Sequence, residues 1–458
     1  MIGRDLPRSL LLPVETTNRE FDGKLLLALK ALERGYEPII GSRTAMHAVL
    51  PLLPKSIYLA KGARSGSERV FSLLEALGHV IVALDEETLV RFPDDAFHMK
   101  LDPKTFNTPR LLFAWGKGNA DVWRDFKDYG GAPIIESGNP RADLLRREVR
   151  GFYEDDVRSI RERYGSFILV SSNFAFVNHF IPNLTRHKVA SHADKKEAEK
   201  LKSGFYQHKQ ALFHAFLDAI PKLAEAAYPS RLVVRPHPSE NQQPWFDATR
   251  GLTNVDVIYE GPMVPWLMAA NGLVHNGCTS AIEAALLGTA AIAYRPVVSA
   301  RYDLHLPNML SATCSSINDV TAACRMMIDD PINSFSLSNA QRTLLGENIS
   351  SIDGKLSCDR ILDAFAEYVD ILAEDRSGDF IGRLRHIGHH YATGAARLVK
   401  KRIRTSASSA LYTSHKFSGM ENQWIDDRIN RFVSALPELP QARSQQIGDN
   451  IFRLRAIN

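Results

Sequence analysis

The sequence is poor in cysteine and has no long apolar run. None of its four cysteines belongs to a CxxC pair, and their spacing fits neither a zinc site nor a disulfide framework, so we expect reduced thiols. No segment approaches the roughly eighteen apolar residues of a transmembrane helix, and Pro13 interrupts the short apolar run near the N-terminus. We therefore expect neither a signal peptide nor a membrane span. The chain should stay in the cytoplasm, where it could still touch a membrane peripherally.

The sequence also has little net charge, no internal repeats and no low-complexity tracts. Its formal charge is +4 over 458 residues, which gives no reason to expect a nucleic-acid partner. A hydrophobic content of 45% and a charged content of 24% are those of a globular protein. A chain of this length is too long for one ordinary core, so the length predicts two or three domains.

Apolar runs of strand length alternate with segments of helical periodicity through most of the chain. Because no hairpin signal separates them, they predict parallel sheets with helices on both faces. The predicted fold is α/β, with two doubly wound, Rossmann-like domains facing a cleft and a helical, basic C-terminal tail. The predicted boundaries are 8–150 for the first domain, 165–335 for the second and 336–458 for the helical segment.

The strands of this prediction fall at regular intervals. They are residues 9–15, 37–43, 56–62, 79–87, 110–116 and 132–141 in the first domain, and 166–173, 231–238, 256–261, 272–276 and 289–296 in the second. A charged helix at 144–166 should connect the domains, and the polar segment 179–204 should be an insertion or mobile loop before a long helix at 205–228.

The stretch HNGCTSAIEAALLG, residues 275–288, predicts a phosphate site. It ends an apolar strand, and in an open α/β sheet ligands bind beyond the carboxyl ends of the strands. Small residues let a phosphate approach the first helical turn, where the N–H groups lack intrahelical partners and carry partial positive charge. Thr279 or Ser280 could donate to that phosphate, or could simply cap the helix. The candidate donor-binding residues here are His275, Asn276, Gly277, Thr279 and Ser280.

Glu283 and the RPHP stretch provide further candidate contacts to a nucleotide sugar. Glu283, one helical turn onward, could accept both hydroxyls of a ribose or merely compensate the helix dipole. His237 lies between two prolines that restrict its backbone, so its imidazole is presented with little freedom and could donate to a phosphate or a nucleotide hydroxyl. Arg235 supplies a charge that suits an anionic donor, and Arg295 is a further candidate for the leaving phosphate.

These residues carry a resemblance to known enzymes. Residues 275–296 resemble the donor-binding signature of GT-B glycosyltransferases, and RPHP resembles the His-Pro motif of bacterial sialyltransferases, polysialyltransferases and Kdo transferases. That resemblance implies that His237 contacts the phosphate of a CMP-sugar, with Thr279 and Ser280 in place of a serine-rich motif. The same pair of motifs is also similar to that of the CDP-glycerol glycerophosphotransferases.

A second resemblance covers roughly residues 8–370. The chain looks like the bacterial family of surface carbohydrate biosynthesis proteins. The stretches that match its pattern are PVETTNREFDGKLLLALKALERGYEPIIGSR, LDEE at 84–87, SGNPRADLL at 137–145 and IDGKLSCDRI at 352–361. The family's name does not imply a particular substrate.

The first domain should hold the acceptor, as the GT-B resemblance implies. An inverting transfer needs a base to take the acceptor's hydroxyl proton. The acidic run at the end of strand 79–87 could supply it or could be a solvated turn, and residues after the first strand are a second choice. The candidate bases are Asp85, Glu86, Glu87, Glu20 and Asp22, and Arg19 is a candidate contact to an anionic acceptor. We expect Arg141 and Asp143 to pair with each other.

The sequence shows no DxD run of the kind that holds a metal-bound nucleotide, so we expect no metal and no cofactor beyond the nucleotide sugar. The tail at 376–416 is rich in arginine and lysine and contains His386, His389 and His390. It could rest on anionic lipid or form a solvated face. The histidines lack the carboxylate that would make a metal site convincing.

The leading hypothesis is an inverting GT-B glycosyltransferase that uses a nucleotide sugar, first of all a CMP-activated acidic sugar. Its acceptor would be a bacterial surface polysaccharide, lipopolysaccharide, capsule or lipid-linked glycan. The alternatives are a polyol-phosphate transferase, a UDP-sugar 2-epimerase and a non-catalytic scaffold that binds nucleotide sugars.

Overall fold

The computed structural model describes residues 6–90, 97–181, 195–330, 336–374, 387–388, 417 and 420–457. The chain forms two compact units: unit 1 is Met1–Thr88, His98–Phe152 and Gly346–Asn458, and unit 2 is Leu89–Phe97 and Tyr153–Leu345. Each unit is built on one mainly parallel sheet with helices, which confirms the predicted α/β class. The division differs from the predicted one, because the chain returns to unit 1 at Gly346 instead of forming a third segment.

Unit 1 contains an eight-stranded sheet in the order β13-β14-β2-β1-β3-β4-β5-β6. Its strands are β1 (Ser9–Val14), β2 (Glu37–Ser42), β3 (Ser56–Ala60), β4 (Val80–Leu84), β5 (Leu112–Ala114), β6 (Ile134–Glu136), β13 (Ala442–Gly448) and β14 (Ile451–Ala456). Strands β1 to β6 are parallel, as the alternation predicted. The C-terminal pair was not predicted: β14 runs antiparallel to β2, and β13 pairs with β14.

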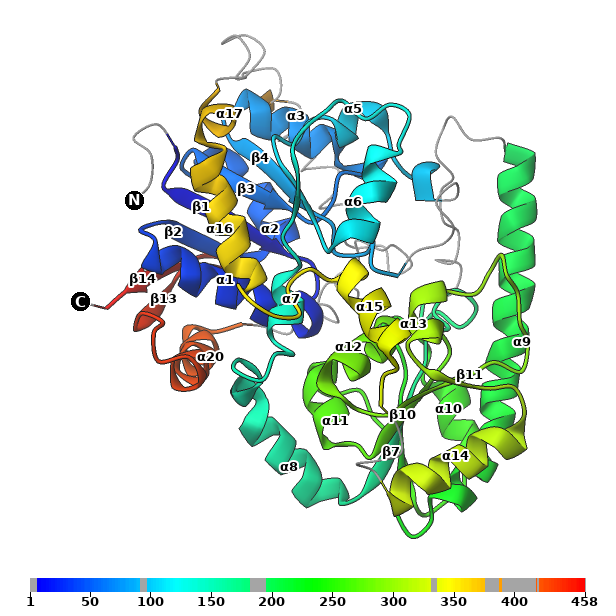
Figure 1. Cartoon of the computed structure of the whole chain (residues 1–458). Helices are drawn as coiled ribbons and strands as arrows, with labels where there is room; N and C mark the ends of the chain where they lie inside the picture. The colour runs from blue at the N-terminus through cyan, green and yellow to red at the C-terminus, as the bar shows by residue number, and fades with distance from the viewer. Residues whose placement is uncertain are drawn as a thin grey trace. The chain divides into compact units, whose positions relative to one another are not determined.

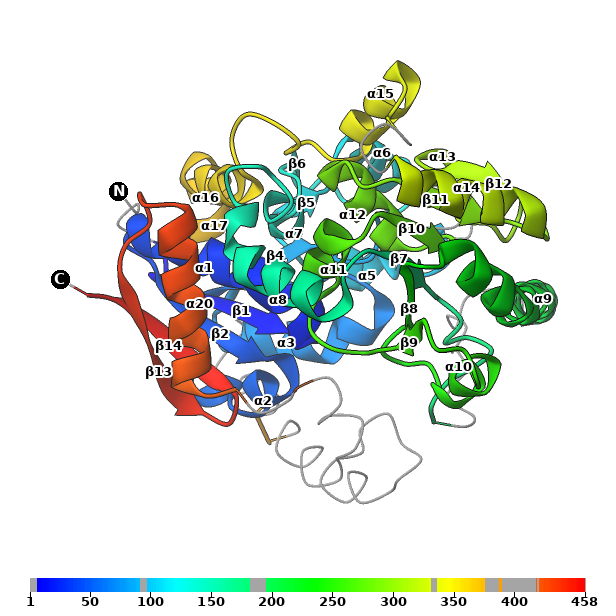
Figure 2. The same cartoon turned by 90° about the horizontal axis from the view of Figure 1, so that it is seen from below.

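The helices of unit 1 are α1 (Asp22–Glu33), α2 (Arg43–Ala48), α3 (Glu68–Ala76), α5 (Pro103–Phe106), α6 (Lys117–Arg124), α7 (Pro140–Asp143), α16 (Ser357–Glu367), α17 (Val369–Ala373) and α20 (Asn422–Ala435). A π-helical turn, Thr17–Phe21, leads into α1. Helix α1 is apolar almost all round because it lies against the sheet and also contacts α7, α16 and α20. Figures 1 and 2 show this layer.

Unit 2 contains a six-stranded parallel sheet in the order β12-β11-β10-β7-β8-β9. Its strands are β7 (Phe167–Ser171), β8 (Arg231–Arg235), β9 (Val255–Val257), β10 (Gly272–His275), β11 (Ala291–Tyr294) and β12 (Ala312–Cys314). All but β12 were predicted. The core between the sheet and the long helix α9 is made of aliphatic and aromatic side chains such as Phe174, Phe216 and Trp245.

Helices cover both faces of this sheet (Figures 1 and 2). The helices of unit 2 are α8 (Glu154–Tyr164), α9 (Lys195–Ala227), α10 (Gln243–Ala248), α11 (Met263–Ala269), α12 (Thr279–Leu287), α13 (His305–Met309) and α14 (Ile317–Asp329), and α15 (Asn339–Asn348) spans the return to unit 1. Helix α9 contacts α10 and α14, whereas α11 contacts α8 and α12. Helix α9 begins at Lys195, so residues 195–204 are helical, contrary to the predicted insertion or loop.

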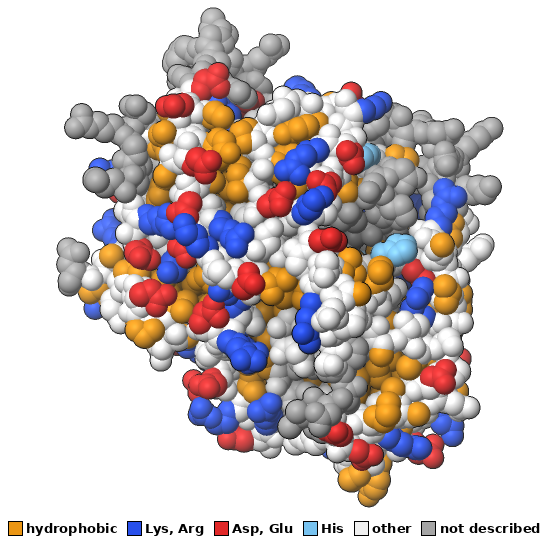
Figure 3. All heavy atoms as spheres, viewed as in Figure 1, with side chains coloured by type: hydrophobic (Ala, Val, Ile, Leu, Met, Phe, Trp, Pro, Cys, Tyr) orange, Lys and Arg blue, Asp and Glu red, His pale blue; other side chains and the backbone are white. Residues whose placement is uncertain are grey.

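Apart from residues 387 and 388, the basic tail at 376–416 that the sequence singled out lies outside the described residues, as do its three histidines. None of the helices in the described ranges is both long and apolar enough to cross a membrane. On the face drawn in Figure 3, lysine and arginine side chains are interspersed with aspartate and glutamate over the coloured surface.

Candidate functional site

Strand order defines one edge in each unit where loops diverge. In unit 2, the chain runs from β7 to β8 on one side and later from β10 to β11 on the other, so β7 and β10 are neighbours at the switch point. In unit 1 the corresponding neighbours are β1 and β3. Ligands of open α/β sheets bind at the carboxyl ends of such strands. Several candidate residues of each unit lie at its own switch point, whereas Arg235, Arg295 and Asp22 have partners elsewhere.

The turn from β10 into α12 has the form expected of an anion site. Gly277 has a φ of 82°, a left-handed conformation that other residues rarely adopt. Cys278 occupies the N-cap position, and Thr279 and Ser280 lie inside the first turn of the helix. Neither hydroxyl residue is therefore the N-cap. The first turn carries the partial positive charge of a helix N-terminus without a side-chain cap in the described residues.

Ser280 and His275 are more deeply engaged than the sequence predicted. The Ser280 hydroxyl is buried, donates to Ser171 Oγ at 3.1 Å and lies 2.5 Å from Cys278 Sγ. His275 is fully buried, and burial lowers its pKa to about 3, so the ring is neutral. Its Nδ1 accepts the Gly277 N–H at 2.9 Å, and its Nε2 donates to Ser311 Oγ at 2.8 Å. His275 therefore stabilises the backbone of the turn from inside the unit. Because it is fully buried, this corrects the prediction that it contacts the nucleotide-sugar donor.

A buried carboxylate that the sequence analysis missed joins β7 to the RPHP loop. Glu240 accepts hydrogen bonds from the Ser172 hydroxyl at 2.8 Å and the Phe174 N–H at 2.8 Å. It also accepts the His237 N–H at 3.2 Å and the Trp245 indole N–H at 3.1 Å. Burial raises the pKa of Glu240, against the effect of these donors. Glu240 thus positions His237 relative to the end of β7.

The tautomer of His237 follows from its neighbour. The Ser239 N–H donates to His237 Nδ1 at 3.1 Å. In the neutral ring the proton therefore resides on Nε2, which can act as a hydrogen-bond donor. The predicted contact of His237 with a phosphate or a nucleotide hydroxyl stays a prediction.

Asn173 links the end of β7 to the α12 turn. Its side-chain N–H donates to Gly277 O at 3.5 Å, and its carbonyl accepts from Asn276 Nδ2 at 3.4 Å. Asn276 is 7% exposed, and its Oδ1 has no partner among the described residues. Glu240 accepts hydrogen bonds from Ser172 and Phe174, the two residues that flank Asn173, and from His237 after β8. The ends of β7, β8 and β10 are therefore connected by hydrogen bonds.

Two predicted phosphate contacts are engaged elsewhere in unit 2. Arg235 is 3% exposed, and its guanidinium lies over the Trp266 ring and donates to the carbonyls of Glu260 at 2.7 Å and Gly261 at 3.0 Å. This corrects its prediction as a donor contact, because these bonds hold it in the body of the unit. Arg295 pairs with Asp303 at 2.5 Å, and the same carboxylate accepts from His208 at 2.8 Å. Glu283 is half-buried on α12, one turn beyond the candidate site.

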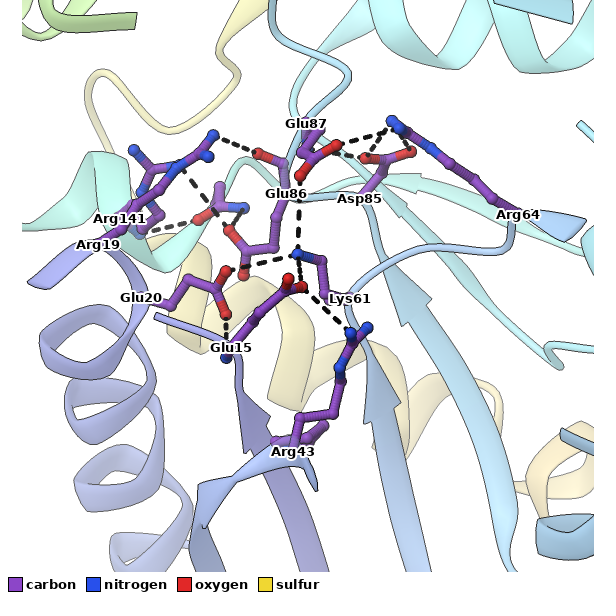
Figure 4. Close-up of polar contacts among 12 residues, drawn as sticks. Glu15, Arg19, Glu20, Arg43, Lys61, Arg64, Asp85, Glu86, Glu87 and Arg141 are labelled. Carbon is purple, nitrogen blue, oxygen red and sulfur yellow. Dashed lines mark hydrogen bonds and ion pairs between the residues drawn. The ribbon is translucent and has the colours of Figure 1, made fainter. Parts of the chain in front are cut away.

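The switch point of unit 1 carries a network of alternating charges (Figure 4). Its centre is Lys24 on α1, whose Nζ donates to Pro13 O at 2.6 Å and lies 3.4 Å from Glu20 and 3.5 Å from Glu86. All three charged side chains are at most 3% exposed. Lys61, which follows β3, forms ion pairs with Glu15, Glu20 and Glu87. The polar loops after β1, β3 and β4 are held together by these pairs.

The network separates the candidate bases by their accessibility. Burial alone raises the pKa of Glu20, but Lys24, Lys61 and the Glu15 N–H outweigh it and lower this pKa to about 2. Such a carboxylate is a weak base. Glu86 is equally buried, whereas the Glu87 side chain is 45% exposed. Glu87 is therefore the accessible carboxylate among Glu20, Glu86 and Glu87. Burial would raise the pKa of Glu87, but Lys61, Arg64 and Arg19 outweigh it and lower this pKa too.

The remaining unit 1 candidates have structural partners. Asp22 accepts from Arg428 of α20 at 3.0 Å and lies 9% exposed. Asp85 pairs with Arg64 at 3.3 Å, and Arg19 donates to Glu86 O at 3.5 Å. Arg141 lies 4.0 Å from Glu86, over the Trp115 ring.

The expected pair between Arg141 and Asp143 is not what the structure shows, because Asp143 instead accepts backbone N–H groups of Ser357 and Cys358. No group of three or more histidine, cysteine, aspartate or glutamate side chains arranged to hold a metal ion occurs among the described residues.

Comparison with known proteins identifies no family. No protein-family profile and no curated protein sequence matches the chain, so the predicted family resemblance stays a prediction. Among solved structures, the wall teichoic acid polymerase TagF aligns over 81% of this chain and 91% of its own, with 9% identity and a TM-score of 0.45. The UDP-GlcNAc 2-epimerase of Methanocaldococcus jannaschii, solved with UDP-GlcNAc and UDP, aligns over 78% and 99%, with 13% identity and a TM-score of 0.47.

A third solved structure, S. aureus MnaA with UDP, aligns over 80% of this chain and 98% of its own, with 13% identity and a TM-score of 0.46. Identity and TM-score are low in all three cases. The chemistry of this chain therefore has to be inferred from its own residues.

Sequence reasoning missed Glu240, Lys24 and Lys209. Glu240 lies only two residues beyond RPHP, so its position in the same loop was a usable signal. Lys24 follows Glu20 by one helical turn, and Lys209 falls on the same helical stripe as Leu212, Phe213 and Phe216. A charged residue on an apolar stripe predicts burial, and a buried charge needs a partner or a ligand.

Proposed function

We propose that this protein is a GT-B glycosyltransferase that moves a sugar from a nucleotide-sugar donor to a bacterial surface polysaccharide or lipid-linked glycan. The first candidate donor is a CMP-activated acidic sugar. Unit 2 binds the donor, and unit 1 supplies the acceptor-side groups. The acceptor and any peripheral contact with a membrane belong to this proposal as well.

The observation that carries the proposal is the connected edge at the β7/β10 switch point. There the α12 N-terminus follows the left-handed Gly277, and the neutral His237 ring, whose Nδ1 accepts the Ser239 N–H, carries its proton on Nε2. A phosphate takes hydrogen bonds from backbone N–H groups and from imidazole, and the helix N-terminus favours its charge. Thr279, in the first turn, and Glu283, one turn beyond, remain the proposed contacts to phosphate and ribose.

Glu87 is the proposed base of an inverting transfer. Its carboxylate takes the proton of the acceptor hydroxyl while the acceptor oxygen bonds to the anomeric carbon. The bond between that carbon and the donor's phosphate oxygen breaks, and the nucleotide leaves with the electron pair. Negative charge then develops on the phosphate, where the α12 N-terminus and His237 stabilise it.

The test is thermal unfolding of the protein with CMP, CDP, UDP, GDP and their sugars. A ligand that binds only the folded state stabilises it by about 2.7 kcal/mol at a hundredfold excess over Kd. We expect CMP and CMP-sugars to raise the midpoint, and His237→Ala to abolish this shift. His214→Ala is the matched control, because His214 is an exposed histidine of the same unit.

The other outcomes separate the alternatives. A shift with UDP compounds alone would favour a UDP-sugar transferase or a UDP-sugar 2-epimerase, and a shift with CDP-glycerol a polyol-phosphate transferase. Nucleotide-sugar binding without transfer to any glycan acceptor would favour the scaffold. If no nucleotide changes the midpoint, the proposal fails.

A further inference from the structure

Lys209 on α9 is a buried lysine at the same sheet edge. Its side chain is 4% exposed, and its ammonium lies 5.6 Å from the centre of the Phe174 ring and 6.0 Å from that of Phe205. Its Nζ donates to Asn173 O at 3.3 Å. Because Asn173 follows β7 at the switch point, the charge of Lys209 lies where β7 meets the α12 turn.

This lysine has no ion-pair partner among the described residues. Lys24 in unit 1 is buried to a similar degree, but two carboxylates lie within 3.5 Å of it. An ammonium group has three donors, and Lys209 uses one of them on a neutral carbonyl. A buried charge without a counter-ion is costly, so it is retained where a ligand supplies the opposite charge.

A second unsatisfied group lies at the same place. Asn173 O, the acceptor of Lys209, also accepts from Asn276 Nδ2 at 3.4 Å. The other end of that amide, Asn276 Oδ1, is buried and has no partner among the described residues. Lys209 needs an acceptor with negative charge, whereas Asn276 Oδ1 needs a donor. A phosphate attached to a hydroxyl-bearing sugar offers both.

We propose that Lys209 binds the phosphate of the nucleotide-sugar donor and stabilises the charge of the leaving nucleotide, while Asn276 Oδ1 accepts from a hydroxyl of the same ligand. This inference rests on the proposed function, whose donor site it completes. The bound phosphate gives Lys209 the counter-ion that it lacks among the described residues. The lysine thereby adds a full positive charge to the partial charge of the α12 N-terminus.

The experiment compares Lys209→Met and Lys209→Arg with the unaltered protein. Calorimetric titrations with CMP, UDP and inorganic phosphate measure affinity, and urea unfolding without ligand measures stability. Lys222→Met is the matched control, because Lys222 lies on the same helix, is 67% exposed and pairs with Glu225. Methionine keeps the apolar packing of the lysine stem on the two rings while removing the charge.

We expect Lys209→Met to bind nucleotide about 10- to 100-fold more weakly, the range for losing a hydrogen bond to a charged group. Without ligand it should be as stable as the unaltered protein or more stable, because the uncompensated charge is gone. Lys222→Met should change neither affinity nor stability by a comparable amount. A less stable Lys209→Met that binds nucleotide normally would show a purely structural role and overturn the inference.

The pH dependence provides a readout that needs no folded methionine variant. Burial lowers the pKa of Lys209 to about 8, against the raising effects of Cys278, Glu240 and Asp303. Burial also raises the pKa of the Cys278 thiol above its usual value. Affinity for nucleotide should therefore fall as the pH rises through 8. In Lys209→Arg the guanidinium stays charged, so a pH-independent affinity is expected there, and an equal decline in both proteins would contradict the assignment.

The same titrations distinguish the two proposals. If nucleotides bind the unaltered protein and Lys209→Met equally, Lys209 is not a phosphate ligand, but the glycosyltransferase proposal survives. If inorganic phosphate binds and requires Lys209 while no nucleotide binds, the anion site stands and the proposed function fails. If neither binds the unaltered protein, both proposals fail.

Discussion

The carboxylate of Asp143 in α7 caps the N-terminus of α16. It accepts the Ser357 N–H at 2.8 Å and the Cys358 N–H at 3.0 Å, across 214 residues of sequence. Leu356 occupies the N-cap position, but its apolar side chain cannot accept these hydrogen bonds. Asp143 is fully buried, so these bonds replace the water that its carboxylate loses. Two stretches singled out in the sequence, SGNPRADLL and IDGKLSCDRI, thus meet through one hydrogen-bonded cap.

Replacing Asp143 should show how much this cap contributes to the stability of the protein. In Asp143→Ala two buried N–H groups lose their acceptor, and we expect the free energy of unfolding to fall by about 1–3 kcal/mol. In Asp143→Asn one amide oxygen remains as an acceptor, so the loss should be smaller. Urea unfolding monitored by circular dichroism measures both, and equal losses would argue against the cap.

The difference in stability between the unaltered protein and Asp143→Asn should depend on pH. Burial raises the pKa of Asp143 from 3.8 to about 6, against the lowering effect of the two N–H donors. The pKa of Asp143 is higher in the folded than in the unfolded protein, so protonation of its carboxyl stabilises the fold. This stabilisation is fully present below pH 3.8 and is lost as the pH rises through about 6. The stability of the unaltered protein relative to Asp143→Asn should therefore decline across this window. A constant difference would contradict the raised pKa.

Lys24 should be among the most sensitive positions of unit 1. Lys24→Met leaves the buried carboxylates of Glu20 and Glu86 without their shared cation, and we expect a loss of about 3–5 kcal/mol. Lys104→Met is the control, because Lys104 forms a solvent-exposed pair with Glu68 whose loss should have a much smaller effect on stability. Equilibrium unfolding in urea measures both variants. A Lys24→Met protein no less stable than Lys104→Met would mean that the network does not hold the loops together.

Glu87 should be required for turnover rather than for folding. Once a donor is identified, Glu87→Gln should lower kcat by about 10²- to 10⁴-fold, the usual contribution of a general base. Its unfolding midpoint should change little, because the side chain is 45% exposed and its ion pairs with Lys61 and Arg64 are partly solvated and contribute little. Glu136→Gln, in an exposed pair with Arg124, is the control. If Glu87→Gln turns over normally, the base has to be sought outside the acidic run after β4.

Gly41 should control how the C-terminal strands attach to unit 1. A Cβ at this position of β2 would lie 2.1 Å from Asn450 O and 2.8 Å from Ile451 Cα. Since both neighbours are backbone atoms, Gly41→Ala should destabilise unit 1 by about 1–3 kcal/mol. Hydrogen exchange of the β14 amides, which pair with β2, should accelerate. In Gly66→Ala, where nothing lies within 4 Å of the added atom, no such change is expected.

Much of the fold could be read from the sequence because hydrophobic periodicity is a local property. The run SLLLPVE, the helix before Gly35 and the segment from GLVHN to Gly288 each contain their own start and stop signals. They match β1, α1, β10 and α12 closely. The C-terminal pair β13–β14 escaped notice, because its exposed strand is mostly polar and its pairing with β2 is a long-range contact.

The site depended on facts that no local pattern contains. Spacing along the chain places Arg235 and His275 at strand ends, but it does not say which groups lie beside them, because that depends on the order of strands in the sheet. Folding turns Arg235 toward two carbonyls and His275 toward Ser311, while it brings Lys209 from the middle of α9 to the end of β7. Chain periodicity specifies the elements, whereas burial and strand order specify which charges are neutralised within the protein and which still require a ligand.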